Sequence, residues 1–160
     1  MLNEELYVIG GLTSTWQQGG LRTNSVMKTT LHGNEWTSVA NFSKSVYGAS
    51  AVSAHGSIWV AGGQLRYGEY LNTLYRYTSH EDSWQAMASM NYQRSHMGLV
   101  VASNMLIAVG GRGREAVHQN GGSILKAVEV YDFEKDQWED MPPLKTARRN
   151  FGIVAFRNYS

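Results

Sequence analysis

The chain has 160 residues and a formal net charge of +1, so its overall charge favours neither nucleic acid nor a membrane surface. It contains no cysteine, which excludes disulfides, zinc–thiolate sites and thiol nucleophiles within these residues. Hydrophobic residues make up 42% and charged residues 17%, a balance that excludes the disordered and coiled-coil classes.

The first predicted element is a short apolar strand that ends in a glycine pair, "LYVIGG" at 6–11. The pattern returns as "IWVAGG" at 58–63 and as "LIAVGG" at 106–111. Three tryptophans follow these pairs at similar intervals: Trp36, Trp84 and Trp138. Two markers in constant order predict an internal repeat of about fifty residues.

Each unit divides into four short strands, taken here in chain order. The first strand is small and apolar, as in "GASAVSA" at 48–54, and a turn rich in Gly, Asn or Ser joins it to the glycine-pair strand. The third strand alternates, as in "TLYRY" at 73–77, and the fourth carries the tryptophan, as in "WQAMA" at 84–88. No segment keeps a 3.6-residue apolar period, so we expect no long helix.

A third marker is a basic residue four positions before a glycine. It reads "KSVYG" at 44–48, "RSHMG" at 94–98 and "RRNFG" at 148–152. Because the pattern recurs, we expect Lys44, Arg94 and Arg148 to tie adjacent units together rather than to contact a ligand.

A four-stranded sheet of about fifty residues cannot bury both of its faces alone. Sheets packed side by side around an axis cover one another, so the repeat predicts an all-β propeller. The glycine pairs then stand where a Cβ would crowd a neighbouring sheet, and the tryptophans fill the widening space between blades.

The sequence resembles the kelch-repeat family of β-propellers, in the type found in kelch-like proteins. The resemblance rests on the glycine pairs, on Val130-Tyr131-Asp132 with a tryptophan six positions after the aspartate, and on Met141–Pro143. It implies blades of four antiparallel strands and a role in protein recognition. It also implies a possible place as substrate receptor of a cullin-type ubiquitin ligase adaptor, with a BTB domain elsewhere.

About three blades' worth of sequence are present. We expect strands two to four of a first blade at 5–40, a second blade at 46–88, a third at 96–142, and the first strand of a next or exchanged blade at 150–157. Three blades do not close a ring, so the chain is expected either to be part of a larger propeller or to self-associate. Two copies would give six blades, with the last strand completing the partner's first blade.

When the charged residues are sorted by the end of the blade on which they lie, the two ends of the molecule are predicted to carry opposite net charges. The loops after the glycine pairs and the links between blades hold nine basic and two acidic residues, whereas the turns at the opposite end hold one basic and six acidic residues. The basic end also has the longer loops, with Trp16 and His118 among their residues. We therefore expect it to bind an acidic peptide or protein segment. The candidate ligand-binding residues are Arg66, Tyr67, Tyr70, His96, Arg112, Arg114 and Asn150.

Signals for chemistry are weak. The five histidines have no partner at metal-ligand spacing, and "GGRGRE" at 110–115 lacks the lysine and helix of a phosphate loop. We expect no catalytic residue, metal or cofactor, and neither nucleic-acid nor membrane binding. A cytoplasmic interaction module is the favoured interpretation. The alternatives are an enzyme at the channel mouth, of sugar isomerase or lyase type, and an actin-associated scaffold.

Overall fold

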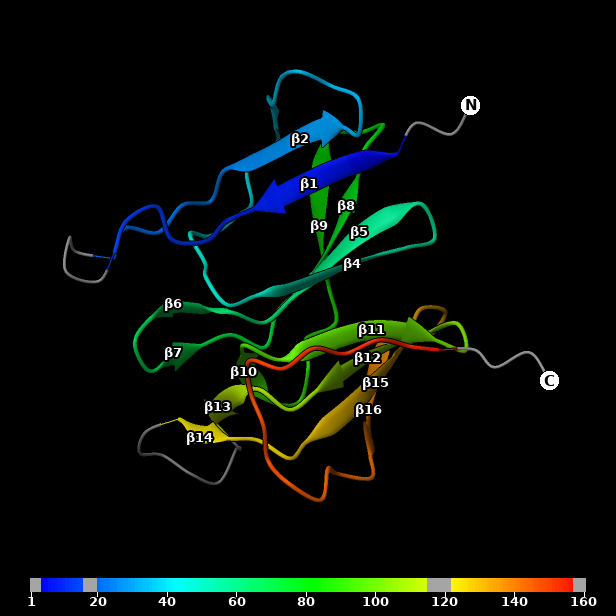
Figure 1. Ribbon diagram of the computed structural model, residues 1–160. Helices are drawn as coiled ribbons and strands as arrows, with labels where there is room; N and C mark the ends of the chain where they lie inside the picture. The colour runs from blue at the N-terminus through cyan, green and yellow to red at the C-terminus, as the bar shows by residue number, and fades with distance from the viewer. Residues whose placement is uncertain (1–3, 16–19, 115–121, 157–160) are drawn as a thin grey trace.

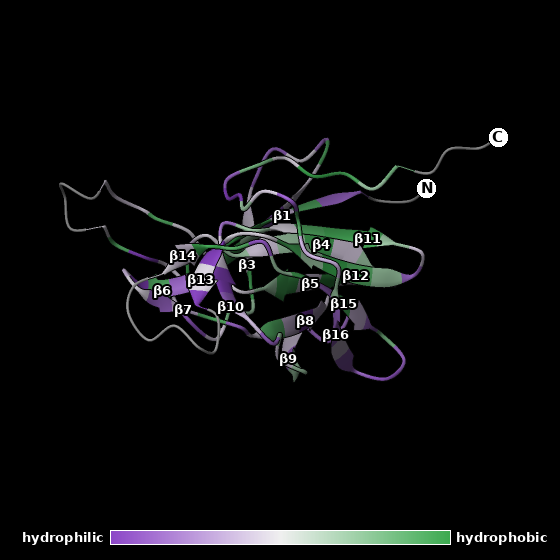
Figure 2. Ribbon diagram, turned by 90° about the horizontal axis from the view of Figure 1, so that it is seen from below, coloured by the Kyte–Doolittle hydropathy of each residue, from purple (hydrophilic) through white to green (hydrophobic). Residues whose placement is uncertain are grey.

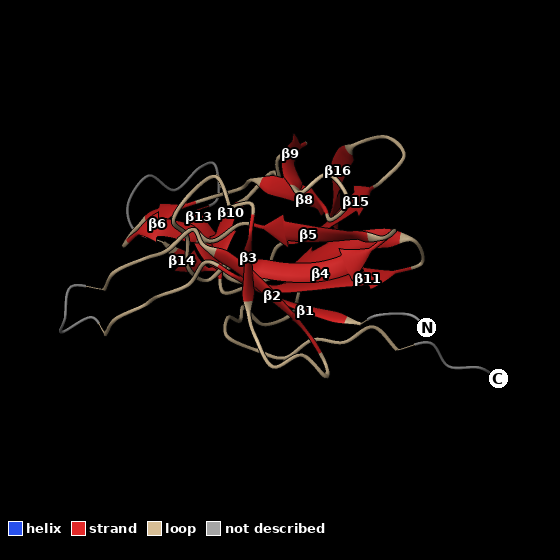
Figure 3. Cartoon of the chain, turned by 90° about the horizontal axis from the view of Figure 1, so that it is seen from above, coloured by secondary structure: helices blue, strands red, loops and turns tan. Residues whose placement is uncertain are grey.

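Antiparallel sheets follow one another along the chain, as the computed structural model shows (Figure 1). The structure describes residues 4–15, 20–114 and 122–156. This part of the chain consists of strands and loops (Figure 3), and it holds no helix long and apolar enough to span a membrane. The prediction of an all-β fold built from propeller blades is confirmed.

Three main sheets carry the repeat. The first has the order β1-β2-β3, with β1 (Glu5–Ile9), β2 (Val26–Thr30) and β3 (Thr37–Val39). The second has the order β4-β5-β8-β9, with β4 (Ser50–Ala54), β5 (Ser57–Ala61), β8 (Leu74–Thr78) and β9 (Ser83–Met87). The third has the order β11-β12-β15-β16, with β11 (Gly98–Ala102), β12 (Met105–Val109), β15 (Val128–Asp132) and β16 (Gln137–Met141).

Short strands also form in the loops after the second and third glycine pairs and in the link between the second and third sheets. These are β6 (Gln64–Arg66), β7 (Glu69–Tyr70), β10 (Gln93–Ser95), β13 (Arg112–Arg114) and β14 (Ser123–Ile124). β6 pairs with β7, and β13 lies between β10 and β14. They gather at one end of the main sheets, and Figure 2 shows that β6, β10 and β13 are hydrophilic whereas β11 and β12 are apolar.

The registers of the sheets establish which residues of the three repeats are equivalent. Ile9 lies opposite Val26, Ala61 opposite Leu74, and Val109 opposite Val128. β1 therefore has the place that β5 and β12 have in the other sheets. Among the described residues, no strand takes the inner place in the first sheet that β4 and β11 have in the second and third.

The alignment of the third sequence marker, the basic residue four positions before a glycine, was wrong in the first repeat, where it was placed two residues too early. The second glycine of each pair donates its N–H to a carbonyl of the following link, and these carbonyls belong to Val46, Arg94 and Arg148. Val46, not Lys44, is thus the equivalent of the two arginines. Backbone conformation rather than residue identity sets the alignment.

A left-handed residue follows two positions after each of these carbonyls. Gly48, His96 and Asn150 have φ of 65°, 53° and 53°. The N–H of His96 donates to the Gly48 carbonyl, and that of Asn150 to the His96 carbonyl, so this residue links each repeat to the next. Gly98, which the marker aligned with Gly48, instead begins β11.

Apolar side chains fill the spaces between neighbouring sheets. Trp59, Leu74, Met90, Met97 and Tyr131 belong to the cluster between the second and third sheets. A second cluster, which contains Val26, Phe42, Val46 and Val60, lies between the first and second sheets. The apolar faces of each sheet are therefore buried only by contact with neighbouring sheets, as the propeller interpretation requires.

The outer hairpin of each later sheet is bonded to the exit of the sheet before it. Asp82 Oδ1 accepts from the Ala40 N–H at 2.8 Å, and Trp84 Nε1 donates to the Ala40 carbonyl at 2.9 Å. Asp136 and Trp138 repeat both bonds on Ala88, at 2.8 and 2.9 Å. The repeated tryptophan thus acts as both a wedge and a hydrogen-bond donor.

A buried ion pair joins β10, in the link after the second sheet, to β15 of the third sheet. Arg94 Nη2 lies 2.6 Å from Glu129 Oε2, and both side chains have no exposed surface. Arg94 Nη1 also donates to the carbonyls of Gly110 and Ala127, at 3.1 and 3.0 Å. The expectation that Arg94 ties adjacent repeats together is confirmed, whereas Arg148 is exposed in this chain.

Candidate functional site

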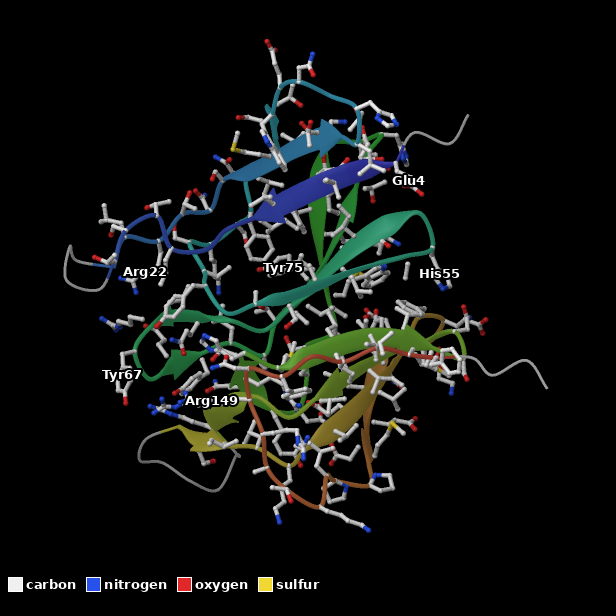
Figure 4. The ribbon with its side chains drawn as sticks, viewed as in Figure 1. Glu4, Arg22, His55, Tyr67, Tyr75 and Arg149 are labelled. Atoms are coloured by element: carbon white, nitrogen blue, oxygen red, sulfur yellow. The ribbon has the colours of Figure 1, made fainter. Side chains whose placement is uncertain are left out.

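A pocket of about 490 Å³ opens at the end of the sheets where the short strands gather. Its lining consists of Leu12, Tyr47, Gln64, Tyr67, Tyr70, His96, Arg112 and Arg149. Figure 4 shows Arg22, Tyr67 and Arg149 at this end of the molecule, and Glu4 and His55 at the opposite end.

Five of the eight lining residues come from two positions of the repeat. Leu12, Gln64 and Arg112 each follow a glycine pair directly. Tyr47 and Arg149 each precede the left-handed residue of a link. Because equivalent positions of a propeller surround its axis, the repeat itself brings these side chains together.

A buried glutamine organises one wall of the pocket. Gln64 Nε2 donates to the Tyr47 hydroxyl, and Gln64 Oε1 accepts from the Ser95 hydroxyl at 3.1 Å. The Ser95 hydroxyl in turn lies 2.9 Å from His96 Nδ1. Both ends of the amide are therefore satisfied, and the chain of bonds fixes the position of the imidazole.

Arg112 is held against an aromatic ring. Its guanidinium carbon lies 5.3 Å from the centroid of Tyr67, and its Nη2 donates to the Tyr67 hydroxyl at 3.1 Å. A further bond runs from its Nε to the Gly122 carbonyl at 3.4 Å. These contacts orient a permanent cation before any ligand arrives.

The surroundings of His96 favour its neutral form. Burial lowers the pKa of His96, and the nearby charges of Arg149 and Arg112 lower it further. The ring also packs against Tyr47, with centroids 6.1 Å apart. An anion in the pocket would oppose the two arginines and favour the charged imidazole.

The structure brings four of the seven predicted residues into this pocket: Tyr67, Tyr70, His96 and Arg112. Tyr67 is largely exposed, whereas Tyr70 is buried and forms part of the wall. Of the other three, Asn150 does not line the pocket, although its backbone N–H donates to the His96 carbonyl at 3.1 Å.

Arg66 and Arg114 line an adjoining groove of about 380 Å³ instead. Arg66 Nε lies 2.7 Å from Glu69 Oε2, so part of its charge is already neutralised. The remaining loop residues singled out above, Trp16 and His118, lie outside the described residues.

Sequence reasoning missed Leu12, Tyr47, Gln64 and Arg149 as lining residues. A usable signal was present for two of them, since Leu12 and Gln64 follow a glycine pair directly, as Arg112 does. The wrong alignment of the first link hid the equivalence of Tyr47 and Arg149.

Residues 4–15, 20–114 and 122–156 contain no group of three His, Asp or Glu side chains arranged to hold a metal ion. The pocket lining given above holds two arginines and a histidine but no carboxylate. The chemistry that the described site offers is therefore the binding of an anion beside aromatic rings.

Comparison with known proteins identifies two stretches, residues 45–91 and 93–145, that match the family described as Kelch motif. Kelch-like protein 26 of Danio rerio is 27% identical over 95% of the chain and 24% of its own length. Kelch repeat and BTB domain-containing protein 12 of Danio rerio is 29% identical, over 99% of the chain and 28% of its own length. Kelch-like protein 23 of Mus musculus is 26% identical, over 99% and 26%. The chain thus spans about a quarter of the length of these relatives.

Proposed function

The chain belongs to the kelch-repeat family, and from that premise we propose that it is a protein-interaction module whose pocket binds an acidic peptide segment of a partner. The observation that carries the proposal is the pairing of Arg112 and Arg149 beside His96 in one pocket. An acidic side chain would find two guanidinium groups there and no competing carboxylate in the described lining.

Each lining residue has a role in this proposal. Arg112 and Arg149 would bind carboxylate oxygens, because the planar guanidinium offers two parallel donors. Tyr67 would cover the apolar part of the peptide, and its contact with Arg112 reduces the entropy lost on binding. Arg66 and Arg114, in the adjoining groove, and Asn150, at the rim, would contact residues that flank the anchor.

The test measures the affinity of the chain for a panel of Asp- and Glu-rich peptides by calorimetry. Arg112→Glu and Arg149→Glu should each weaken binding about tenfold or more, since each replaces an attraction by a repulsion. Lys145→Glu is the matched control, because it makes the same charge change on an exposed residue outside the pocket. Equal affinities for all four proteins would refute the proposal.

We also propose a setting for this activity: partner recognition in the cytoplasm, within a cullin-type ubiquitin ligase adaptor. The support is a relative whose name joins kelch repeats with a BTB domain. Affinity purification followed by mass spectrometry should recover a cullin together with an acidic partner. Arg112→Glu should lose the partner alone.

We propose further that copies of the chain associate to complete the propeller. The support is the first sheet, which has three strands where the second and third have four. Light scattering on the separated chain, at several concentrations, tests this self-association directly.

A further inference from the structure

Two arginines lie two residues apart on the strand that borders the pocket. Arg112 and Arg114 are the first and last residues of β13, with Gly113 between them. Side chains two positions apart on a strand lie on the same face, and their Cα atoms are about 6.5–7 Å apart. β13 therefore carries a pair of permanent cations at a spacing that the strand itself fixes.

The two arginine side chains line different cavities. Arg112 lines the pocket together with Arg149, whereas Arg114 lines the adjoining groove of about 380 Å³. Tyr67 and Tyr70 line both cavities, so the pocket and the groove share an aromatic wall. A ligand that extends past this wall from the pocket would enter the groove.

The hairpin of β6 and β7 lies against both arginines. The Arg112 guanidinium lies over the Tyr67 ring, and a Cβ added at the next residue, Gly68, would lie 3.9 Å from Arg114 Nη2. Figure 1 shows this hairpin beside β10 and β13. The contacts of the two arginines therefore agree with their places on one face of β13.

The strand that carries the two arginines is firmly held. β13 is paired on both sides, with β10 and with β14. A Cβ added at Gly113 would overlap the Gln93 carbonyl, so β13 approaches β10 more closely than another residue would allow. A rigid strand keeps the spacing of the two cations when a ligand binds, which lowers the entropic cost of binding.

The positive charge of the groove comes mainly from Arg114. Arg66 and Glu69 both line the groove and form an ion pair, with Nε and Oε2 2.7 Å apart. Within residues 4–15, 20–114 and 122–156, Arg114 forms no ion pair, and its buried Nε has no hydrogen-bond partner. Arg114 is therefore available to an anion that enters the groove.

Gln93 adds a neutral donor beside this cation. It lies opposite Arg114 in the register of β10 and β13, and both residues line the groove. Side chains of directly opposed residues are neighbours on one face of a sheet. A carboxylate bound by Arg114 can therefore also accept a hydrogen bond from the Gln93 amide.

We propose that the chain recognises an extended peptide segment with two acidic residues separated by one residue, of which one binds Arg112 and Arg149 in the pocket and the other binds Arg114 in the groove. Side chains two positions apart in an extended peptide are also about 6.5–7 Å apart on one side, which matches the spacing on β13. The residue between the two acids points away from β13 and is free to vary. The inference rests on the function proposed above and adds the pattern of acids that the partner carries.

Other spacings of two acids do not match the strand. Residues one or three positions apart in an extended peptide point to opposite sides, so only one of the two acids can reach β13. Residues three positions apart share a side in a helix, but a peptide of about six residues forms no stable helix in water. The spacing of the acids is therefore a property that binding can measure.

Three peptides of identical composition test the spacing. Each has blocked ends and a central Asp-Ser-Asp-Ser, Asp-Asp-Ser-Ser or Asp-Ser-Ser-Asp between glycines, so all three carry the same charge. Titration followed by NMR measures even weak affinities. Asp-Ser-Asp-Ser should bind about fivefold more tightly than the other two, which is the contribution of a partly exposed charge pair. A peptide with a single aspartate, Ser-Ser-Asp-Ser, should bind like the weaker two.

Variants of the chain assign each acid to its arginine. Arg114→Gln should weaken the binding of Asp-Ser-Asp-Ser about fivefold and leave that of the single-aspartate peptide unchanged. Arg112→Gln should weaken the binding of both peptides. The matched control is Lys145→Gln, which removes one positive charge outside both cavities and should change neither affinity.

A gain of affinity provides a test that misfolding cannot imitate. Glu69→Gln removes the carboxylate from the groove lining and frees Arg66 from its ion pair. This variant should bind Asp-Ser-Asp-Ser about two- to fivefold more tightly than the unmodified chain does, with no gain for the single-aspartate peptide.

The outcomes separate this inference from the function on which it rests. Equal affinities for the three orders, a preference for Asp-Ser-Ser-Asp, or an Arg114→Gln variant that binds Asp-Ser-Asp-Ser as the unmodified chain does would overturn the two-acid pattern. If Arg112→Gln still weakened the binding of the single-aspartate peptide, the proposed function would stand. Failure of every acidic peptide to bind would overturn both.

Discussion

At the scale of single residues, backbone conformation repeats more faithfully than side-chain identity. Gly48, His96 and Asn150 share a left-handed backbone although their side chains have nothing in common. Histidine and asparagine accept this conformation at a moderate cost, and the hydrogen bonds on either side hold it in place. The side chain at this position is thus free to vary, which allows it to contribute to a binding surface.

The first prediction concerns His96. An acidic ligand should raise its pKa, which burial and two arginines lower in the free protein. Binding then takes up a proton, so affinity should increase as the pH falls from the pKa of the complex to the lower pKa of the free protein. Calorimetry across this range checks the trend. His96→Asn, which keeps the left-handed backbone, should flatten the profile, and an unchanged slope would exclude His96 as its source.

The second prediction concerns the glycine pairs. A Cβ at Gly62, where φ is 65°, would lie 2.3 Å from the Arg94 carbonyl oxygen. Gly56 has a φ of 68°, but nothing lies within 4 Å of its added Cβ. Gly56→Ala should therefore cost about 1–2 kcal/mol of unfolding free energy for the backbone alone. Gly62→Ala should cost about 1–3 kcal/mol more. Urea denaturation of both variants measures the difference, and similar midpoints would contradict it.

At the scale of strands and sheets, the repeated tryptophans differ in whether they contact a preceding sheet. Trp138 is buried and bonded to the Ala88 carbonyl, whereas Trp36 has no sheet before it in the described chain. Trp138→Phe should destabilise the chain by about 1–3 kcal/mol, through the lost bond and the lost volume. Trp36→Phe in a monomeric background should change stability by less than about 0.5 kcal/mol. Thermal unfolding of both variants measures this, and equal losses would rule out the directional tie.

The main strands could be predicted from sequence because each depends on a local pattern. The glycine pair, the turn residues and the tryptophan each mark a strand end within a few residues. The short strands could not be predicted, since β10 and β13 pair across two repeats and depend on how the links meet the loops. The same dependence on distant backbone explains the wrong alignment of Lys44.

Only part of the candidate site could be predicted, for a related reason. Composition indicated a basic, aromatic end, and the structure places Tyr67, His96 and Arg112 together there. Whether a residue in a loop faces the axis depends on backbone direction, which composition does not encode. Arg66 therefore faces an adjoining groove, and Arg149, counted only as a charge, lines the pocket.

At the scale of the whole molecule, the basic pocket and the acidic turns lie at opposite ends of the sheets. The pocket with its arginines opens at one end of the sheets, and the turns that contain Asp82 and Asp136 lie at the other ends of the same strands. The proposed ring would place two such pockets around one axis. Because the two pockets would be close, a partner with two acidic segments would bind with greater avidity than one with a single segment.

The aspartate and tryptophan ties both run from the outer hairpin of a sheet to the exit of the sheet before it. The second sheet takes part through both its outer hairpin and its exit at Ala88, whereas the first sheet takes part only through its exit at Ala40. In an isolated copy, the first sheet is then the place where fraying starts, with amide protons of β1 exchanging for deuterium well before those of β12. Association of copies into a complete propeller would slow that exchange, so the exchange rate of the β1 amides would measure the association.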